Sequence, residues 1–185
     1  SAAATDVGSK RRINEDAMLE RPEAGLWVVA DGMGGHAAGD VASHAVVHPL
    51  SLVQRPDALA DFVEAVEDAL MSVNQQLRDY ATQELGGRTV GSTVVVLLLS
   101  ARTGVCLWAG DSRLYRLRGG QLSRISRDHS AVQEMVDAGA ITQEEADRHP
   151  KSNVITRAVG GSERLLVDAA VFAPETGDTY LLCSD

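Results

Sequence analysis

The sequence predicts an α+β domain built mainly from antiparallel sheets. Three features indicate this class: amphipathic helical patterns near the beginning of the chain, many short apolar runs typical of strands after them, and short helical patterns inserted among those runs. A chain of 185 residues is long enough for one domain with a substantial buried core. We therefore expect a single domain over residues 1–185.

The first half of the chain predicts one buried strand and two long helices. The apolar run Leu26–Ala30 is followed by Asp31 and Gly32, which indicates a strand that carries Asp31 to its end. Apolar residues then recur at helical spacing over Ala38–Leu50 and again over Pro56–Leu85. Both segments are expected to be amphipathic helices whose apolar stripes face the core.

The second half predicts a series of strands interrupted by two short helices. Runs of β-branched and apolar residues, separated by glycine-containing turns, are typical of antiparallel strands. The predicted strands are Ser92–Leu99, Val105–Ala109, Leu114–Leu117, Leu122–Ile125, Val154–Ala158, Leu165–Phe172 and Tyr180–Cys183. Helices are predicted over Asp128–Ala138 and Thr142–Arg148, and Thr142 with Glu145 forms a capping box at the start of the second.

The composition argues against several classes of partner. A formal net charge of -9 disfavours electrostatic binding of nucleic acid, and the 4% of aromatic residues offers little surface for stacking of bases. The longest apolar run is far shorter than the roughly 20 residues that cross a bilayer. Cys106 and Cys183 lie in apolar runs and are interpreted as buried thiols, which fits a reducing compartment. We expect a cytoplasmic protein without a membrane span.

Acidic residues stand at the ends of predicted strands or beside them. The clusters are Asn14-Glu15-Asp16, Asp31-Gly32, Gly110-Asp111-Ser112-Arg113 and Ser184-Asp185. If strand ends gather in space, these carboxylates repel one another unless a cation neutralises them, and ligands made only of oxygen favour Mg2+ or Mn2+. For any one aspartate, the alternative that it caps a turn stays open.

Six segments follow one another along the chain: Gly8–Asp16, Val29–His36, Gly91–Thr93, Ala109–Arg113, Arg127–Ser130 and Asn153–Ala158. Their order is the one found in bacterial phosphatases of the PP2C (PPM) family, and the chain resembles this family over essentially its whole length. The resemblance implies a four-layer sandwich of two antiparallel β-sheets flanked by helix pairs, and metal-dependent hydrolysis of phosphoserine and phosphothreonine in proteins. The insertion over about 130–152 resembles a mobile flap beside the cleft.

The resemblance also implies roles for particular residues. Asp31 resembles the carboxylate that bridges two Mn2+ or Mg2+ ions, which activate a water for hydrolysis without a covalent intermediate. Arg11 resembles the arginine that holds the substrate phosphate through a bidentate pair. The other metal ligands implied are Glu15 and Asp16, directly or through water, the carbonyl of Gly32, Asp185 and, for a third and weaker ion, Asp111.

The chain departs from the family pattern at two places. Met33 stands where some relatives have a histidine, so the acid that protonates the leaving group is unassigned; water is the expected substitute, with His36 as a further candidate. The sequence stops at Asp185, before the glycine and the later Asp-Asn pair of the family. We therefore expect a domain truncated at its C-terminus.

The expected partners are phosphorylated proteins, including a serine/threonine kinase of the bacterial Hanks type, and the expected state is a monomer. Two other functions stay open at this point. One is a catalytically impaired, phosphatase-like regulatory or binding domain, and the other is a metal-dependent phosphoesterase for nucleotides or small phosphates.

Overall fold

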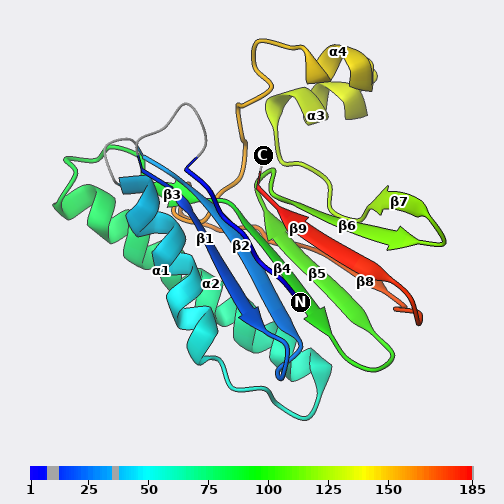
Figure 1. Cartoon of the computed structure of the whole chain (residues 1–185). Coiled ribbons are helices and arrows are strands. Elements are labelled where there is room, and N and C mark those ends of the chain that lie inside the picture. Colours follow the sequence, from blue (N-terminus) through cyan, green and yellow to red (C-terminus); the bar gives the residue numbers. More distant parts are fainter. Residues whose placement is uncertain (8–12, 35–37, 185) are drawn as a thin grey trace.

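A computed structural model describes residues 1–7, 13–34 and 38–184. The chain forms strands, helices and a return to strands in the order that the sequence predicts (Figure 1). The strands are β1 (Asp16–Arg21), β2 (Leu26–Met33), β3 (Gly91–Ser92), β4 (Val94–Leu99), β5 (Gly104–Ala109), β6 (Arg113–Arg118), β7 (Gln121–Arg124), β8 (Asp168–Phe172) and β9 (Thr179–Cys183). The helices are α1 (Ala38–Leu52), α2 (Leu59–Gln83), α3 (Ala131–Asp137) and α4 (Gln143–Asp147).

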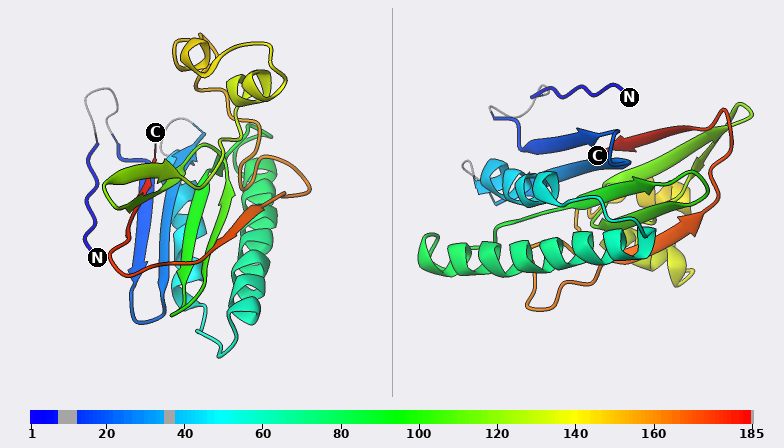
Figure 2. Two further views of the ribbon diagram at one scale, coloured as in Figure 1. Left: turned by 90° about the vertical axis from the view of Figure 1, so that its right-hand side faces the viewer. Right: turned by 90° about the horizontal axis from the view of Figure 1, so that it is seen from below.

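The strands of the described residues form two antiparallel sheets. The larger has six strands in the order β1-β2-β4-β5-β8, with β3 paired to β2, and the smaller has the order β7-β6-β9. Helices α1 and α2 lie on one face of the larger sheet, and the smaller sheet lies against its other face (Figure 2). The α+β class with two antiparallel sheets is therefore confirmed.

Side chains along β2 point alternately to the two faces of the larger sheet, and they contribute to two separate apolar cores. Leu26, Val28 and Ala30 are buried against the helices, whereas Trp27 and Val29 point to the opposite face and pack between the two sheets. Strands β4 and β5 are buried on both faces, which explains their nearly continuous apolar sequences.

Helix α2 confirms the predicted amphipathic pattern. Its buried stripe repeats every three or four residues and consists of Phe62, Val66, Leu70, Val73 and Leu77 together with one polar residue, Asn74. Fully burying each of the large apolar side chains stabilises the fold by about 1.5–3 kcal/mol.

The segment 130–152 stands out from the end of the sandwich and carries α3 and α4, which pack on each other (Figure 1). Ser130 is the N-cap of α3, because its hydroxyl accepts a hydrogen bond from the backbone N–H of Gln133. The predicted capping box of Thr142 and Glu145 is present at the start of α4. Local sequence therefore determines where both helices begin.

The sequence analysis assigned one strand wrongly and missed another. Val154–Ala158 is not a strand; it makes an isolated bridge from Ile155 to Ser130, and Val154 is exposed. Its backbone instead bonds to the base of the insertion, where Ala131 donates to Val154 and Thr156 donates to His129. Strand β1 was not predicted, although its pairing with β2 is continuous from Asp16 to Arg21.

The outer face of the smaller sheet carries exposed apolar side chains, Leu117, Leu122 and Leu181. Cross-strand register places them on the side opposite Leu114, which belongs to the core between the sheets.

None of the helices in residues 1–7, 13–34 and 38–184 is long and apolar enough to cross a membrane.

Candidate active site

The core between the sheets becomes polar at one end. In β2 the face that carries Trp27 and Val29 continues with Asp31, and β1 places Asp16 directly opposite Asp31 in the antiparallel register. Side chains at opposed positions lie on the same face, with Cβ atoms about 4.5–5.5 Å apart. Two carboxylates from neighbouring strands therefore point into the same end of the space between the sheets.

Strand β9 brings Ser184 to the same place. The hydroxyl of Ser184, just after β9, donates to Oδ2 of Asp16 at 3.0 Å. The backbone N–H of Asp16 donates to Oδ1 of Asn14 at 3.0 Å, which fixes the start of β1. Ser184 therefore lies beside Asp16 at this end of the sandwich.

The backbone of Asp31 is held by two polar residues, Ser92 and Thr93, that directly precede the apolar strand β4. Its N–H donates to Oγ1 of Thr93 at 3.1 Å, and its carbonyl accepts from the N–H of Thr93 at 2.8 Å and from the hydroxyl of Ser92 at 3.0 Å. Ser92 and Thr93 are almost fully buried. These bonds leave Asp31 little freedom to move along the strand direction.

Thr93 also connects Asp31 to the turn that carries Asp111. Its Oγ1 lies 2.6 Å from Oγ of Ser112. Gly110 has a φ of 114°, and a Cβ at that position would lie 2.6 Å from Cβ of Thr93. Only glycine therefore allows this turn to lie so close to Thr93, which brings Asp111 to the end of the sheet that carries Asp31.

Glu15 and Gly32 lie on a different face from Asp16 and Asp31. The N–H of Gly32 donates to the carbonyl of Glu15 at 2.9 Å. A Cβ built on Gly39 in the first turn of α1 would lie 2.6 Å from Oε1 of Glu15 and 2.9 Å from the carbonyl oxygen of Gly32. The structure thus brings Glu15 and Gly32 together against α1, whereas Asp16 and Asp31 face the space between the sheets.

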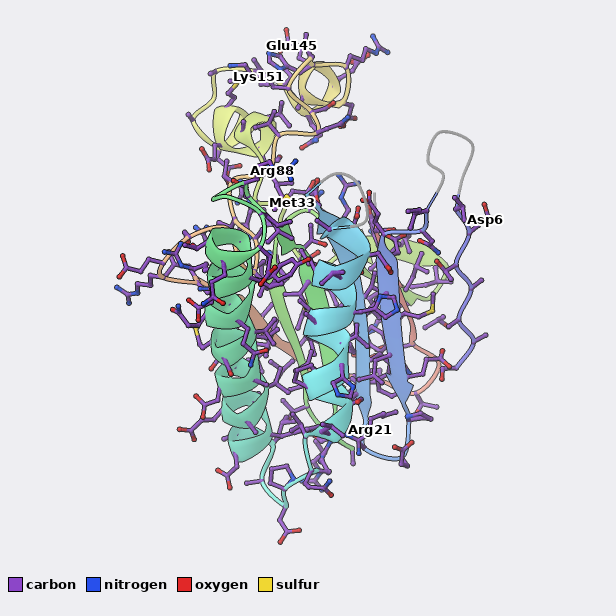
Figure 3. The ribbon with its side chains drawn as sticks, turned by 90° about the vertical axis from the view of Figure 1, so that its left-hand side faces the viewer. Asp6, Arg21, Met33, Arg88, Glu145 and Lys151 are labelled. Carbon is purple, nitrogen blue, oxygen red and sulfur yellow. The ribbon has the colours of Figure 1, made fainter. Side chains whose placement is uncertain are left out.

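The insertion lies above this polar end. Figure 3 shows Met33, the last residue of β2, at the same end of the molecule as Glu145 and Lys151 of the insertion, and Arg21 at the far end. At the base of the insertion, Arg113 binds Asp128 through Nε and Nη2 at 3.1 and 2.6 Å. These hydrogen bonds raise the pKa of Arg113, so it is a fixed positive charge near the strand ends.

Five of the predicted site residues lie among the described residues, and three of these five lie at the same end of the sandwich. Asp16, Asp31 and Asp111 are brought to one end of the sandwich by β1, β2 and the turn after β5. Arg11, Asp185 and the candidate acid His36 lie outside the described residues. The sequence interpretation gave no role to Thr93, Ser112 or His129, although polar residues at the ends of apolar strands were a signal that could have identified the first two.

The donor set at this end fits a hard divalent cation. Its atoms are oxygens of carboxylates, hydroxyls and backbone carbonyls, which Mg2+ and Mn2+ prefer. Within the described ranges, no three His, Cys, Asp or Glu side chains come close enough to hold a metal ion by themselves. A complete site therefore needs further ligands beside the Asp16–Asp31 pair, such as backbone carbonyls or water.

Comparison with known proteins identifies the family and the fold. The sequence profile of the family described as Protein phosphatase 2C matches residues 8–167. The serine/threonine phosphatase stp of Listeria welshimeri is 37% identical over 188 residues, which cover 98% of this chain and 75% of that protein.

Solved structures agree with this match. The structure of PppA, described as a key regulatory component of T6SS in Pseudomonas aeruginosa, superposes with a TM-score of 0.90 at 49% identity and covers 99% of this chain and 75% of that one. The catalytic domain of the phosphatase PstP, solved in complex with two manganese ions, has a TM-score of 0.86 at 35% identity and covers 100% of this chain and 76% of that one.

A sandwich of two antiparallel sheets with carboxylates at one end of its core has the architecture of a metal-dependent phosphatase. The chain belongs to the protein phosphatase 2C family. It is therefore a serine/threonine protein phosphatase of the PP2C type.

Proposed function

We propose that the chain hydrolyses phosphoserine and phosphothreonine with Mn2+ or Mg2+ held at the polar end of the core between its sheets. The observation that carries this proposal is the register of β1 and β2, which sets Asp16 and Asp31 opposite each other at that end. The two manganese ions in the PstP structure support the choice of cation. Asp31 and Asp16 are the first candidates for ligands, with Asp111 for a third ion.

Each of the other proposed residues has a limited task. Gly32 is proposed to offer its backbone carbonyl to a cation. Glu15 is proposed to bind a cation, directly or through water, from the side of the strand ends that faces α1. Asp185 is proposed as a further ligand because it follows Ser184 in the sequence, and the hydroxyl of Ser184 binds Asp16. Arg11 is proposed to bind two phosphoryl oxygens, which orients the phosphorus and offsets the charge that develops during hydrolysis.

When bound, the cations lower the pKa of the attacking water and neutralise charge on the phosphoryl oxygens. The chain's own part is to hold that arrangement rigidly: Thr93 and Ser92 fix the backbone of Asp31, and Ser184 fixes the carboxylate of Asp16. The side chain of Met33 cannot donate a proton, so a water molecule is proposed to protonate the leaving serine or threonine.

We further propose that the substrates are phosphorylated proteins that include a bacterial serine/threonine kinase, and that the phosphatase domain works as a monomer in the cytoplasm. The free thiols of Cys106 and Cys183 support a reducing compartment.

The test of this function is hydrolysis of a phosphothreonine peptide by the full-length natural protein in ¹⁸O-labelled water. We expect activity to need added Mn2+ or Mg2+, to stop in excess chelator, and to place one ¹⁸O in the released phosphate. Thiol alkylation should leave activity unchanged, because burial raises the pKa of Cys106 to about 12 and keeps it protonated. Turnover in chelator, or its loss after alkylation, would contradict the proposal. A chain that binds Mn2+ and phosphopeptide without turnover would be a regulatory domain instead.

A further inference from the structure

A buried histidine at the base of the insertion binds both polar backbone groups of Gly110, in the turn that carries Asp111. We propose that His129 is a positioning residue for the phosphatase reaction, whose imidazole holds the Gly110–Asp111 turn in place and links it to the base of the insertion. The inference rests on the proposed function, in which Asp111 binds a cation.

His129 binds both polar backbone groups of Gly110. The N–H of Gly110 donates to Nδ1 of His129 at 3.1 Å, and the N–H of His129 donates to the carbonyl of Gly110 at 2.9 Å. Because Gly110 precedes Asp111 directly, these two bonds set where the carboxylate of Asp111 begins. On the other side of the turn, Gly110 packs against Thr93, so the turn is held between Thr93 and His129.

The hydrogen bonds also determine which nitrogen of the ring carries the proton. Nδ1 accepts from Gly110, so it has no proton, and a neutral ring then carries its proton on Nε2. Nε2 lies 3.1 Å from Oδ2 of Asp168 and donates to it. Burial lowers the pKa of His129, although the bond to Asp168 opposes this shift, so the neutral form that the geometry needs is also favoured by the surroundings.

The ring cannot easily turn away from this position. It stacks on Trp108, with centroids 6.1 Å apart and an angle of 14° between the rings, and Nε1 of Trp108 donates to the carbonyl of Arg127 at 2.6 Å. Asp168 is held from its other side by Arg157 at 2.7 Å. Only 7% of His129 is exposed, so the imidazole is packed as tightly as a core residue.

The same residue connects the two ends of the insertion. His129 lies just before α3, and its carbonyl accepts from the N–H of Thr156, where the chain returns from the insertion. Ser130 makes a bridge to Ile155 beside it. A displacement at the base of the insertion is therefore transmitted to Gly110 through His129, which gives the insertion a direct physical link to a proposed cation ligand.

Two substitutions separate the bond to Gly110 from the bond to Asp168. His129→Asn places an amide oxygen near the position of Nδ1 and keeps an acceptor for Gly110. His129→Gln reaches the position of Nε2, keeps a donor for Asp168 and loses the acceptor for Gly110. Both variants lose the stacking on Trp108, so each is the matched control of the other for packing and for thermal stability.

We expect His129→Gln to weaken Mn2+ binding by about 10- to 100-fold and to lower kcat by a similar factor, as for other partners that orient metal ligands. Calorimetry measures the Mn2+ affinity. His129→Asn should stay near the parent in both, KM should change little in either, and the Tm of the two variants should be similar. Equal losses of Mn2+ affinity in the two variants, in step with Tm, would overturn the inference and leave His129 as a packing residue.

Asp111→Asn distinguishes failure of the inference from failure of the proposed function. If Asp111→Asn weakens Mn2+ binding and His129→Gln does not, only the role of His129 is wrong. If Asp111→Asn binds Mn2+ like the parent, the proposed cation ligand and the inference are both wrong.

A measurement on the unsubstituted protein without metal keeps the inference testable if a variant does not fold. Long-range ¹H–¹⁵N NMR should find His129 protonated on Nε2 alone, and the Gly110 amide should exchange slowly with solvent. A proton on Nδ1 of His129, or fast exchange of the Gly110 amide, would contradict the proposal that His129 holds the Gly110–Asp111 turn.

Discussion

Thr93 Oγ1 and Ser112 Oγ lie 2.6 Å apart and join the two sheets at the end where the proposed active site lies. Thr93 directly precedes β4 of the larger sheet, and Ser112 directly precedes β6 of the smaller one. The same oxygen of Thr93 accepts from the N–H of Asp31. One hydroxyl thus contacts both the residue before β6 and the backbone of Asp31, the proposed cation ligand.

Thr93→Val keeps the shape of this side chain and removes its hydroxyl. We expect the free energy of unfolding to fall by about 1–3 kcal/mol, because the buried Asp31 N–H loses its acceptor, and Mn2+ binding to weaken as Asp31 moves. Thr93→Ser is the matched control, since it keeps the hydroxyl, and should bind Mn2+ like the parent. The measurements are urea unfolding and calorimetry. If Thr93→Val binds Mn2+ as tightly as Thr93→Ser, the hydroxyl does not position Asp31.

We expect Asp178, in the turn before β9, to make a contribution to the stability of the fold that depends on pH. Hydrogen bonds from Arg118 at 2.7 Å hold the pKa of Asp178 well below its usual range. A carboxyl whose pKa is depressed on folding stabilises the fold above its unfolded pKa of about 3.9, and this contribution is lost as pH falls through the folded pKa.

Asp178→Asn should therefore lower the urea midpoint at pH 7. The difference in urea midpoint between this variant and the parent should stay constant down to about pH 5. Below about pH 4 the difference should shrink, because the unfolded parent takes up a proton on Asp178 that the folded parent does not bind. Urea unfolding at a series of pH values measures this directly. A difference that is the same at pH 3 and pH 7 would mean that the charge of Asp178 is unimportant.

The sequence predicted the fold correctly where a local pattern of residues determines a helix. The stripe on α2 and the capping box at Thr142 depend on residues close together in the chain, and both are present. Val154–Ala158 has the composition of a strand, but its backbone bonds to the base of the insertion, which no local pattern reveals. Strand β1 was missed because Ala17 faces the helix core while Met18 points between the sheets, so its sequence has no clear alternation.

The site was predictable only in part, for a related reason. Aspartates at strand ends are visible in sequence, and Asp16, Asp31 and Asp111 do lie at one end of the sandwich. The bonds that hold them join residues far apart in the chain, such as Thr93 with Ser112 and His129 with Asp168. Partners of this kind follow from the sheet register, which the sequence pattern did not determine.

The central claim is that the Asp16–Asp31 pair holds the catalytic cations. Asp31→Asn keeps the size of the side chain and removes the negative charge that offsets a divalent cation, so Mn2+ binding should weaken strongly and turnover should fall by several orders of magnitude. The fold should survive, because Asp31 lies at the polar end of β2 and outside both apolar cores. Asp68→Asn, an exposed aspartate on α2, is the matched control and should bind Mn2+ like the parent.

The most direct measurement is therefore calorimetric titration of Mn2+ into the full-length natural protein and its Asp31→Asn variant, with turnover of a phosphothreonine peptide measured on the same samples. We predict that the parent and Asp68→Asn bind Mn2+ and hydrolyse the peptide, and that Asp31→Asn does neither at the same metal concentration. If Asp31→Asn binds Mn2+ and turns over the peptide like the parent, Asp31 is only a residue at a strand end and the proposed active site is wrong.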